Sequence, residues 1–127
     1  VDKTVKALNE QGKSIKGARV LVLGLSYKPN IDDDRESPGY ELIELLEALG
    51  AEAAYCDPFI PRTKPVRKHD LARTSVPCTP EEFGRHDAIV IATAHRAFSE
   101  SALYEAVPLV IDTRNVVPAT VRNKVRA

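Results

Sequence analysis

The sequence predicts an α/β domain of three layers, with a mostly parallel sheet that carries helices on both faces. Three observations support this class. Short apolar runs of strand length recur along the chain, segments with helical spacing and helix-start signals separate them, and polar loops follow the runs. Runs that are apolar on both sides are typical of strands buried between two helical layers. With 127 residues, the chain is long enough for one domain with a single core.

The first strand and the helix after it form the clearest unit. Val20–Leu23 is the apolar run, and Gly24 ends it. Ser37 and Pro38 have the residue types of an N-cap and of a first helical position. Gly50 is a typical stop for the helix that they open. The spacing i, i+3, i+4, i+7 predicts one apolar stripe on this helix, formed by Leu42, Leu45, Leu46 and Leu49.

Three further strands are predicted from apolar runs. They are Ala51–Cys56, Ala88–Thr93 and Leu109–Asp112. The run at 88–93 is the most uniformly apolar of the three, so we expect it near the centre of the sheet.

Helices or loops are predicted for the remaining segments. The predicted helices are Val1–Gln11, Pro80–Gly84, Ser99–Ala106 and a loose one at Val121–Ala127. Thr79 is expected to cap the second of these, with Glu82 in the capping-box position. Leu103 and Ala106 are expected to face the core. Pro61–Val76 has no clear period and is predicted to be a loop with at most one helical turn.

Charged side chains gather where ligands bind in such folds. Tyr27, Lys28 and Arg35 lie in the loop after the first strand, together with the acidic run Asp32–Asp34. Arg114 follows the last predicted strand, so its backbone starts from the same edge of the sheet, where open α/β sheets bind ligands. Three cations that converge there predict an anion site. The alternative is that the loop cations merely neutralise the acidic run in solvent.

Two other polar residues follow predicted strands. Gly24–Pro29 matches neither glycine-rich phosphate fingerprint. In dinucleotide-binding folds an acidic residue at the end of the second strand can bind the ribose. Without the fingerprint, Asp57 is interpreted as a turn residue, as is common for Asp before Pro. His95 could act as a base or touch a ligand. We favour a structural hydrogen bond for it.

Composition excludes several classes of function. The formal net charge is zero, from 18 basic and 18 acidic residues, which argues against nucleic acid as the main partner. No apolar run approaches the length of a membrane span, and no signal-peptide pattern opens the chain, so no membrane partner is expected. Two cysteines make neither a disulfide framework nor a metal site. The lack of Met and the abrupt amphipathic opening suggest a piece of a longer protein.

The run LGLSYKPNIDDDRESP, at 23–38, resembles a signature of the UDP-glucose/GDP-mannose dehydrogenase family, in the C-terminal domain that closes over the nucleotide sugar. The similarity continues through YCDPFIP, IVIATAHRAF and VIDTRN and covers nearly the whole chain in order. The resemblance implies a Rossmann-like domain. Because the family is cytosolic, it also implies a cytoplasmic protein in which Cys56 and Cys78 are free thiols.

The resemblance also implies an activity for the longer protein. Members of the family oxidise the C6 alcohol of a nucleotide sugar to a carboxylate in two NAD-dependent steps and supply polysaccharide biosynthesis. Their N-terminal domain holds NAD, and their central helical domain carries the dimer contact and the catalytic cysteine. Residues 1–17 would then be a lead-in helix and linker from the central domain, and 18–127 the nucleotide-sugar-binding domain of a homo-oligomeric enzyme. The RESP form of the signature looks most like enzymes of UDP-N-acetyl-hexosamines.

Roles for single residues follow only from the resemblance. Tyr27 and Lys28 match positions that contact the nucleotide sugar, and Arg114 matches an arginine near it. Arg35 matches an arginine that reaches the NAD pyrophosphate. No segment matches the family's NAD fingerprint or its catalytic-cysteine motif, so no catalytic residue is expected and the chain alone should be inactive.

Two other functions compete with this interpretation. A stand-alone, non-catalytic module that binds nucleotide or phosphate is compatible with the net charge and the anion edge. A receiver-like signalling domain is suggested by Asp32–Asp34. It also needs an Asp at the end of a central strand and a Lys at the end of the last, where this chain has 92–94 (ATA) and 112–114 (DTR). The receiver interpretation therefore fails.

Overall fold

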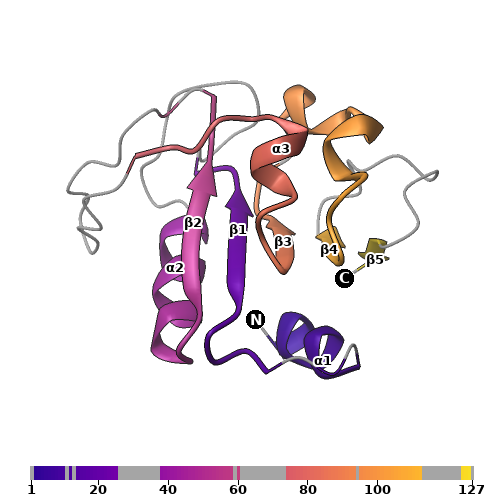
Figure 1. Ribbon diagram of the computed structural model, residues 1–127. Helices are drawn as coiled ribbons and strands as arrows, with labels where there is room; N and C mark the ends of the chain where they lie inside the picture. Colours follow the sequence, from indigo (N-terminus) through magenta and orange to yellow (C-terminus); the bar gives the residue numbers. More distant parts are fainter. Residues whose placement is uncertain are drawn as a thin grey trace.

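Five parallel strands form one sheet, in the order β2-β1-β3-β4-β5, in the computed structural model (Figure 1). The structure describes residues 2–10, 12, 14–25, 38–58, 60, 74–93, 95–112 and 124–126. The strands are β1 (Arg19–Leu23), β2 (Glu52–Cys56), β3 (Ala88–Ile91), β4 (Val110–Asp112) and β5 (Lys124–Arg126). The helices are α1 (Asp2–Glu10), α2 (Pro38–Ala48) and α3 (Pro80–Phe83), and η1 (Arg96–Ser99) and η2 (Ser101–Tyr104) are 3-10 helices.

The strand order contains one reversal of direction. From β1 the chain moves outward to β2, then crosses back to β3 on the other side of β1. The carboxyl ends of β1 and β3 are therefore the switch point at which open α/β sheets bind ligands. This confirms the predicted three-layer α/β class and the central place of β3.

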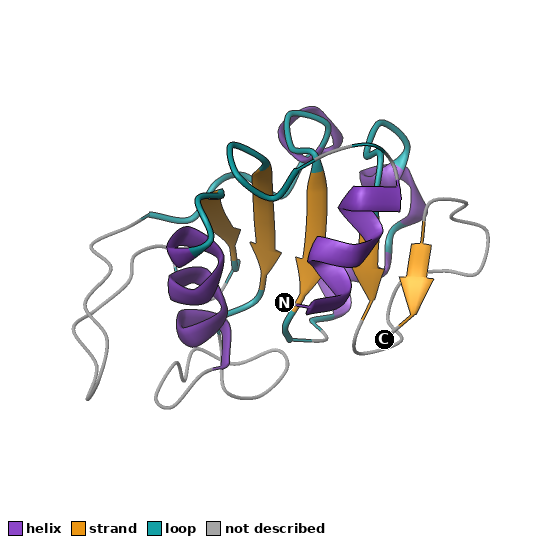
Figure 2. Cartoon of the chain, turned by 90° about the horizontal axis from the view of Figure 1, so that it is seen from below, coloured by secondary structure: helices purple, strands orange, loops and turns teal. Residues whose placement is uncertain are grey.

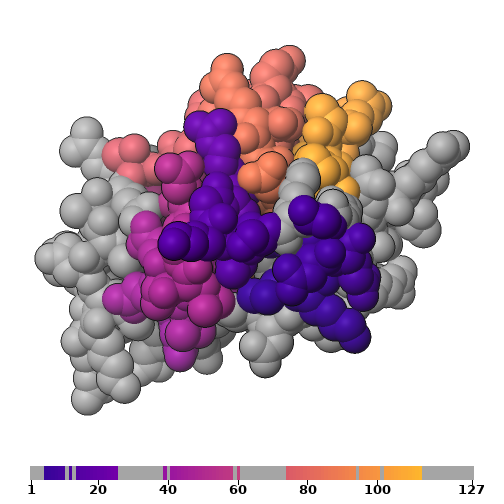
Figure 3. All heavy atoms as spheres, turned by 60° about the horizontal axis from the view of Figure 1, so that its bottom comes forward, coloured from indigo at the N-terminus to yellow at the C-terminus, as the bar shows by residue number. Residues whose placement is uncertain are grey.

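Helices cover both faces, as alternation along the strands requires. One core contains Ala7 and Leu8 of α1 and Ile43 and Leu46 of α2, packed on Val20, Val22, Val90 and Ile111 of the strands. Figure 2 shows these two helices on the same side of the sheet, and both are visible on the face in Figure 3. The second core contains Phe83 of α3, Phe98 of η1 and Leu103 and Tyr104 of η2, packed on Leu21, Leu23, Ile89 and Ile91.

The predicted leucine stripe of α2 is only partly correct. Leu46 is fully buried and Leu42 is partly buried, but Leu45 and Leu49 are 47% and 44% exposed. The buried face instead takes in Ile43. The helix carries two overlapping apolar stripes, and the spacing of leucines alone does not say which of them meets the sheet.

Two other helix predictions are wrong. The segment at 99–106 forms 3-10 turns, in which Leu103 is buried as predicted but Ala106 is exposed and Val107 lies inside. The segment at 121–127 contains β5, whose Lys124 pairs with Val110. A free sheet edge beside β4 offers backbone hydrogen bonds that outweigh a weak helical pattern.

The cap of α3 is confirmed in part. Thr79 Oγ1 accepts a hydrogen bond from the Glu82 N–H at 3.2 Å, with Pro80 at the first position. The Glu82 carboxylate contacts Arg85 and His86 at 3.2 and 3.1 Å. Ser37, the predicted cap of α2, and residues 61–73 of the predicted loop lie outside the described residues.

Gly24 allows the ends of β1 and β3 to approach each other. Its φ is +99°, and a Cβ there would lie 2.5 Å from the Cβ of Thr93 and 2.9 Å from its backbone nitrogen. The Thr93 N–H donates to the Leu23 carbonyl at 3.2 Å. Glycine at this position is therefore required by both conformation and space.

We predict that Gly24→Ala lowers the free energy of unfolding by about 3 kcal/mol or more, because strain adds to the clash with Thr93. Gly17→Ala is the matched control, since Gly17 has a φ of +82° but no atom within 4 Å of the added Cβ. It should cost only about 1 kcal/mol. Urea denaturation measures both, and equal losses would contradict the role of the close approach.

Candidate functional site

The four residues predicted to bind ligand lie outside the described residues. They are Tyr27, Lys28, Arg35 and Arg114. The structure does describe where their segments start. Leu23, Ile91 and Asp112 stand in register across the sheet, so the segment at 26–37 and the segment after Asp112 leave the same edge with β3 between them.

A buried pair of side chains joins the strand ends at this edge. Nε2 of His95 lies 2.9 Å from Oδ2 of Asp57, and both side chains are fully buried. Asp57 directly follows β2 and His95 follows β3 by a few residues. The predicted structural hydrogen bond of His95 is confirmed.

The carboxylate of Asp57 also holds the end of β1. Its Oδ2 accepts a second hydrogen bond, from the Leu25 N–H at 2.7 Å. An ionised carboxylate only accepts hydrogen bonds, so the hydrogen between His95 and Asp57 is carried by Nε2 of the imidazole. The pair therefore fixes the residue from which the segment 26–37 departs.

Asp57 does more than the sequence suggested. Its carbonyl accepts from the Ile60 N–H at 3.1 Å, which is the turn that was predicted. Its own N–H donates to Ser75 Oγ at 2.9 Å. The interpretation as a turn residue missed the carboxylate, because no local pattern says that β1 lies beside β2. The usable signal was its position, directly after a predicted strand.

The ring of His95 has a defined orientation. Its edge meets the ring of Phe98, with centroids 5.3 Å apart and planes at 61°. The Phe98 N–H donates to the His95 carbonyl at 3.0 Å. His95 and Asp57 are fully buried, so neither is available to a ligand as an acid or a base. Their hydrogen bonds instead hold the strand ends at this edge of the sheet.

Other parts of the described chain offer less for ligand chemistry. A depression of about 590 Å³ is lined by Val5, Lys6, Asn9, Glu10 and Leu49. Leu49 comes shortly before β2, so this depression lies at the amino ends of strands, away from the edge where ligands bind in such sheets. Within the described ranges, no group of three or more His, Cys, Asp or Glu side chains could hold a metal ion. No helix of that part of the chain has the length and apolarity to cross a bilayer.

We predict that His95→Ala lowers the free energy of unfolding by about 3 kcal/mol, because Asp57 is then left buried without its partner. Asp57→Asn should cost a similar amount. In the double variant the losses should be non-additive by more than about 1 kcal/mol, because the two groups interact directly. Denaturant titration of the four proteins measures the cycle.

The control for this cycle is Glu52→Gln. Glu52 lies 3.7 Å from Arg19 in an exposed ion pair. Its loss should cost less than about 1 kcal/mol. Additive effects of the His95 and Asp57 changes would show that the two side chains do not act as a unit.

Comparison with solved structures supports the fold. A UDP-D-ManNAc dehydrogenase from Pyrococcus horikoshii superimposes with a TM-score of 0.74 at 26% identity, over 95% of this chain and 27% of that one. An NDP-N-acetyl-D-galactosaminuronic acid dehydrogenase from Methanosarcina mazei gives 0.75 at 25% identity, over 99% and 27%. The Rossmann-like domain predicted from the sequence is confirmed.

Comparison of sequences gives the family. A UDP-glucose 6-dehydrogenase from Rhizobium meliloti is 33% identical over 118 residues, which are 87% of this chain and 26% of that protein. A UDP-N-acetyl-D-mannosamine dehydrogenase from Pyrococcus horikoshii is 31% identical over 88% and 25%. The chain thus spans about a quarter of the length of these relatives. Residues 21–119 match the model of the UDP binding domain of the UDP-glucose/GDP-mannose dehydrogenase family, and the chain belongs to that family.

Proposed function

We propose that this chain is the nucleotide-sugar-binding domain of an NAD-dependent UDP-sugar 6-dehydrogenase, which oxidises the C6 alcohol of its substrate to a carboxylate. The observation that carries the proposal is the match of residues 21–119 to the UDP binding domain. Relatives include enzymes named for UDP-glucose and for UDP-N-acetyl-hexosamines, so the substrate class is a UDP-sugar. The enzyme would be cytoplasmic and homo-oligomeric.

Tyr27, Lys28 and Arg114 are the proposed contacts to the nucleotide sugar. A diphosphate favours cations with several donors, and an aromatic ring suits a flat or apolar surface. The segments that carry these residues leave β1 and β4 at one edge. The hydrogen bonds of Asp57 to Leu25 and His95 would hold the first of these segments at its start.

NAD would be the hydride acceptor, and a domain outside this chain would bind most of it. The residues that follow the first strand, Gly24–Pro29, do not match the glycine-rich fingerprint of a dinucleotide cradle. Arg35 is the one residue of this chain that we assign to the cofactor, at its pyrophosphate. No step of the oxidation is therefore assigned to this chain.

Residues 1–17 are the proposed lead-in from a central domain, and 18–127 the binding domain proper. Ala7 and Leu8 of α1 are buried in the same core as the strands. The lead-in helix is thus packed on the domain and should stay with it when the domain is produced alone.

We predict that UDP and UDP-N-acetylglucosamine shift the NMR resonances of Tyr27, Lys28 and Arg114, and that GDP does not. Lys28→Ala and Arg114→Ala should each weaken UDP binding at least about tenfold, because each removes charge-assisted hydrogen bonds. Lys6→Ala, in α1, is the matched control and should leave the affinity unchanged. Equal binding of UDP and GDP, or an effect of Lys6 alone, would contradict the proposed site.

We further predict that the chain alone gives no sustained NADH production with UDP-sugars. Covalent oxidation needs a positioned, activated thiolate together with its catalytic partners. Neither Cys56, which ends a strand, nor Cys78, which precedes the cap of α3, lies in a segment that matches the family's catalytic-cysteine motif. An absorbance assay at saturating NAD checks this, and continued turnover by the purified chain would overturn it.

A further inference from the structure

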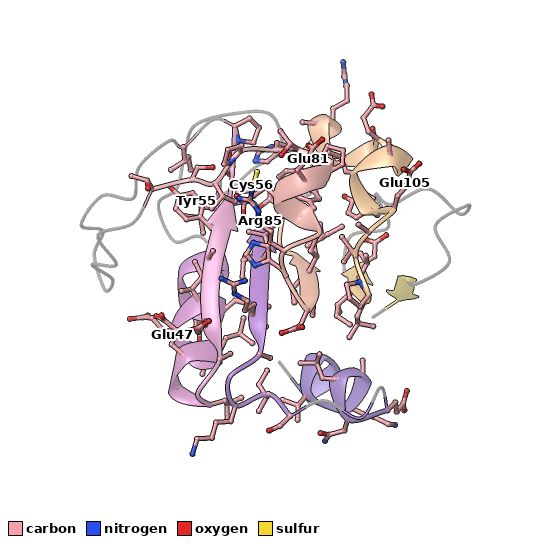
Figure 4. The ribbon with its side chains drawn as sticks, viewed as in Figure 1. Glu47, Tyr55, Cys56, Glu81, Arg85 and Glu105 are labelled. Atoms are coloured by element: carbon pink, nitrogen blue, oxygen red, sulfur yellow. The ribbon has the colours of Figure 1, made fainter. Side chains whose placement is uncertain are left out.

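Two cysteines meet on the sheet face that carries α3. Cys56 is the last residue of β2 and belongs to the buried cluster of Phe83 and Tyr104. Cys78 is partly buried and packs against the same cluster. Figure 4 shows Cys56 at the carboxyl end of β2, close to the segment that leads into α3. Both cysteines are free thiols in this structure.

The backbone holds these two thiols together. The Val76 N–H donates to the Tyr55 carbonyl at 2.9 Å, and the Asp57 N–H donates to Ser75 Oγ at 2.9 Å. The residues on both sides of Cys56 are thus tied to the strand-like segment that ends at Cys78. The side chain of Cys56 belongs to the same buried cluster against which the side chain of Cys78 packs.

The two thiols are not equivalent. The hydrogen bond from Cys56 lowers the pKa of Cys78, whereas that interaction and then burial raise the pKa of Cys56. Cys78 is also the more exposed of the two. A thiolate is the form that attacks an oxidant, so Cys78 is the group that reacts first.

We propose that Cys56 and Cys78 form a redox modification site, which hydrogen peroxide converts into an intramolecular disulfide. The Cys78 thiolate attacks one peroxide oxygen, the O–O bond breaks, and hydroxide leaves with Cys78 as a sulfenic acid. The Cys56 sulfur then attacks the Cys78 sulfur and the S–O bond breaks. The leaving hydroxide takes the Cys56 proton and departs as water as the S–S bond forms. In sum, two thiols lose two hydrogens and two electrons, and the peroxide is reduced to two waters.

The disulfide would constrain the segment that begins with Asp57, the residue whose carboxylate holds the strand ends at the ligand edge. It closes the chain from Asp57 to Pro77 into a loop, and Asp57 is the first residue of that loop. A cross-link of this length restricts the unfolded chain and stabilises the fold. The inference rests on the placement of the thiols and does not depend on the proposed UDP binding.

The test oxidises the folded chain with hydrogen peroxide, then unfolds it and labels the remaining thiols with N-ethylmaleimide for mass spectrometry. We expect that neither cysteine of the oxidised monomer takes up the label, and that its mass is two hydrogen atoms below that of the reduced chain. After treatment with dithiothreitol, both cysteines should be labelled again. The melting temperature should rise by roughly 5 °C or more. In urea the same bond should form at least about tenfold more slowly, because unfolding separates the thiols.

Single variants provide the controls. Cys78→Ser should keep its one label after the same brief peroxide exposure, because the remaining thiol is buried. Cys56→Ser should lose its label as a sulfenic or sulfinic acid, without gaining a disulfide. Retention of both labels in the unmodified chain, an intermolecular dimer as the main product, or an equal rate of bond formation in urea would each overturn the proposal.

Discussion

Oδ2 of Asp57 accepts two hydrogen bonds in the interior, from the Leu25 N–H at 2.7 Å and from His95 Nε2 at 2.9 Å. A buried carboxylate is costly to desolvate, and its cost is offset only when close donors surround it. Here the donors come from segments that follow β1 and β3, while the carboxylate follows β2. One oxygen therefore links the segments that follow three neighbouring strands, in addition to the backbone hydrogen bonds between them.

The order of the strands explains why this support lies where it does. The chain turns outward from β1 to β2 and then crosses to β3, so the carboxyl ends of β1 and β3 form the switch point. The helix α2, which comes after β1, and the helix η1, which comes after β3, pack in different cores on opposite faces of the sheet. The Asp57–His95 pair and the close approach of Gly24 to Thr93 join the strand ends at this point.

Much of this architecture could be predicted from the chain itself. The apolar runs gave four strands and the central position of β3, because burial on both faces leaves a pattern that depends on one short segment alone. The Thr79 cap was predictable for the same reason, since its hydrogen bond to Glu82 is local. The short strand β5 was missed, because what makes it a strand is the exposed edge of β4.

Two other features were not predicted for the same reason, which is that they depend on contacts with parts of the chain distant in the sequence. Leu45 is exposed and Ile43 is buried, because the sheet selects one of two apolar stripes on α2. The carboxylate of Asp57 escaped notice because its partners are 32 and 38 residues away in the sequence. Contacts of that range follow from strand order, which composition and spacing do not encode. The proposed ligand residues were found by resemblance, and their placement stays a prediction.

The residues at the carboxyl edge of the sheet indicate which functions this chain contributes to its proposed enzyme. The residues that follow β1, Gly24–Pro29, do not match a glycine-rich dinucleotide fingerprint. The side chains of Asp57 and His95 are fully buried, and neither cysteine lies in a segment that matches the family's catalytic-cysteine motif. The contribution that we propose for this chain is therefore positive charge for a ligand, through Lys28, Arg35 and Arg114. Such a domain would bind and enclose an anionic substrate, and the reacting groups would have to come from elsewhere in the longer protein.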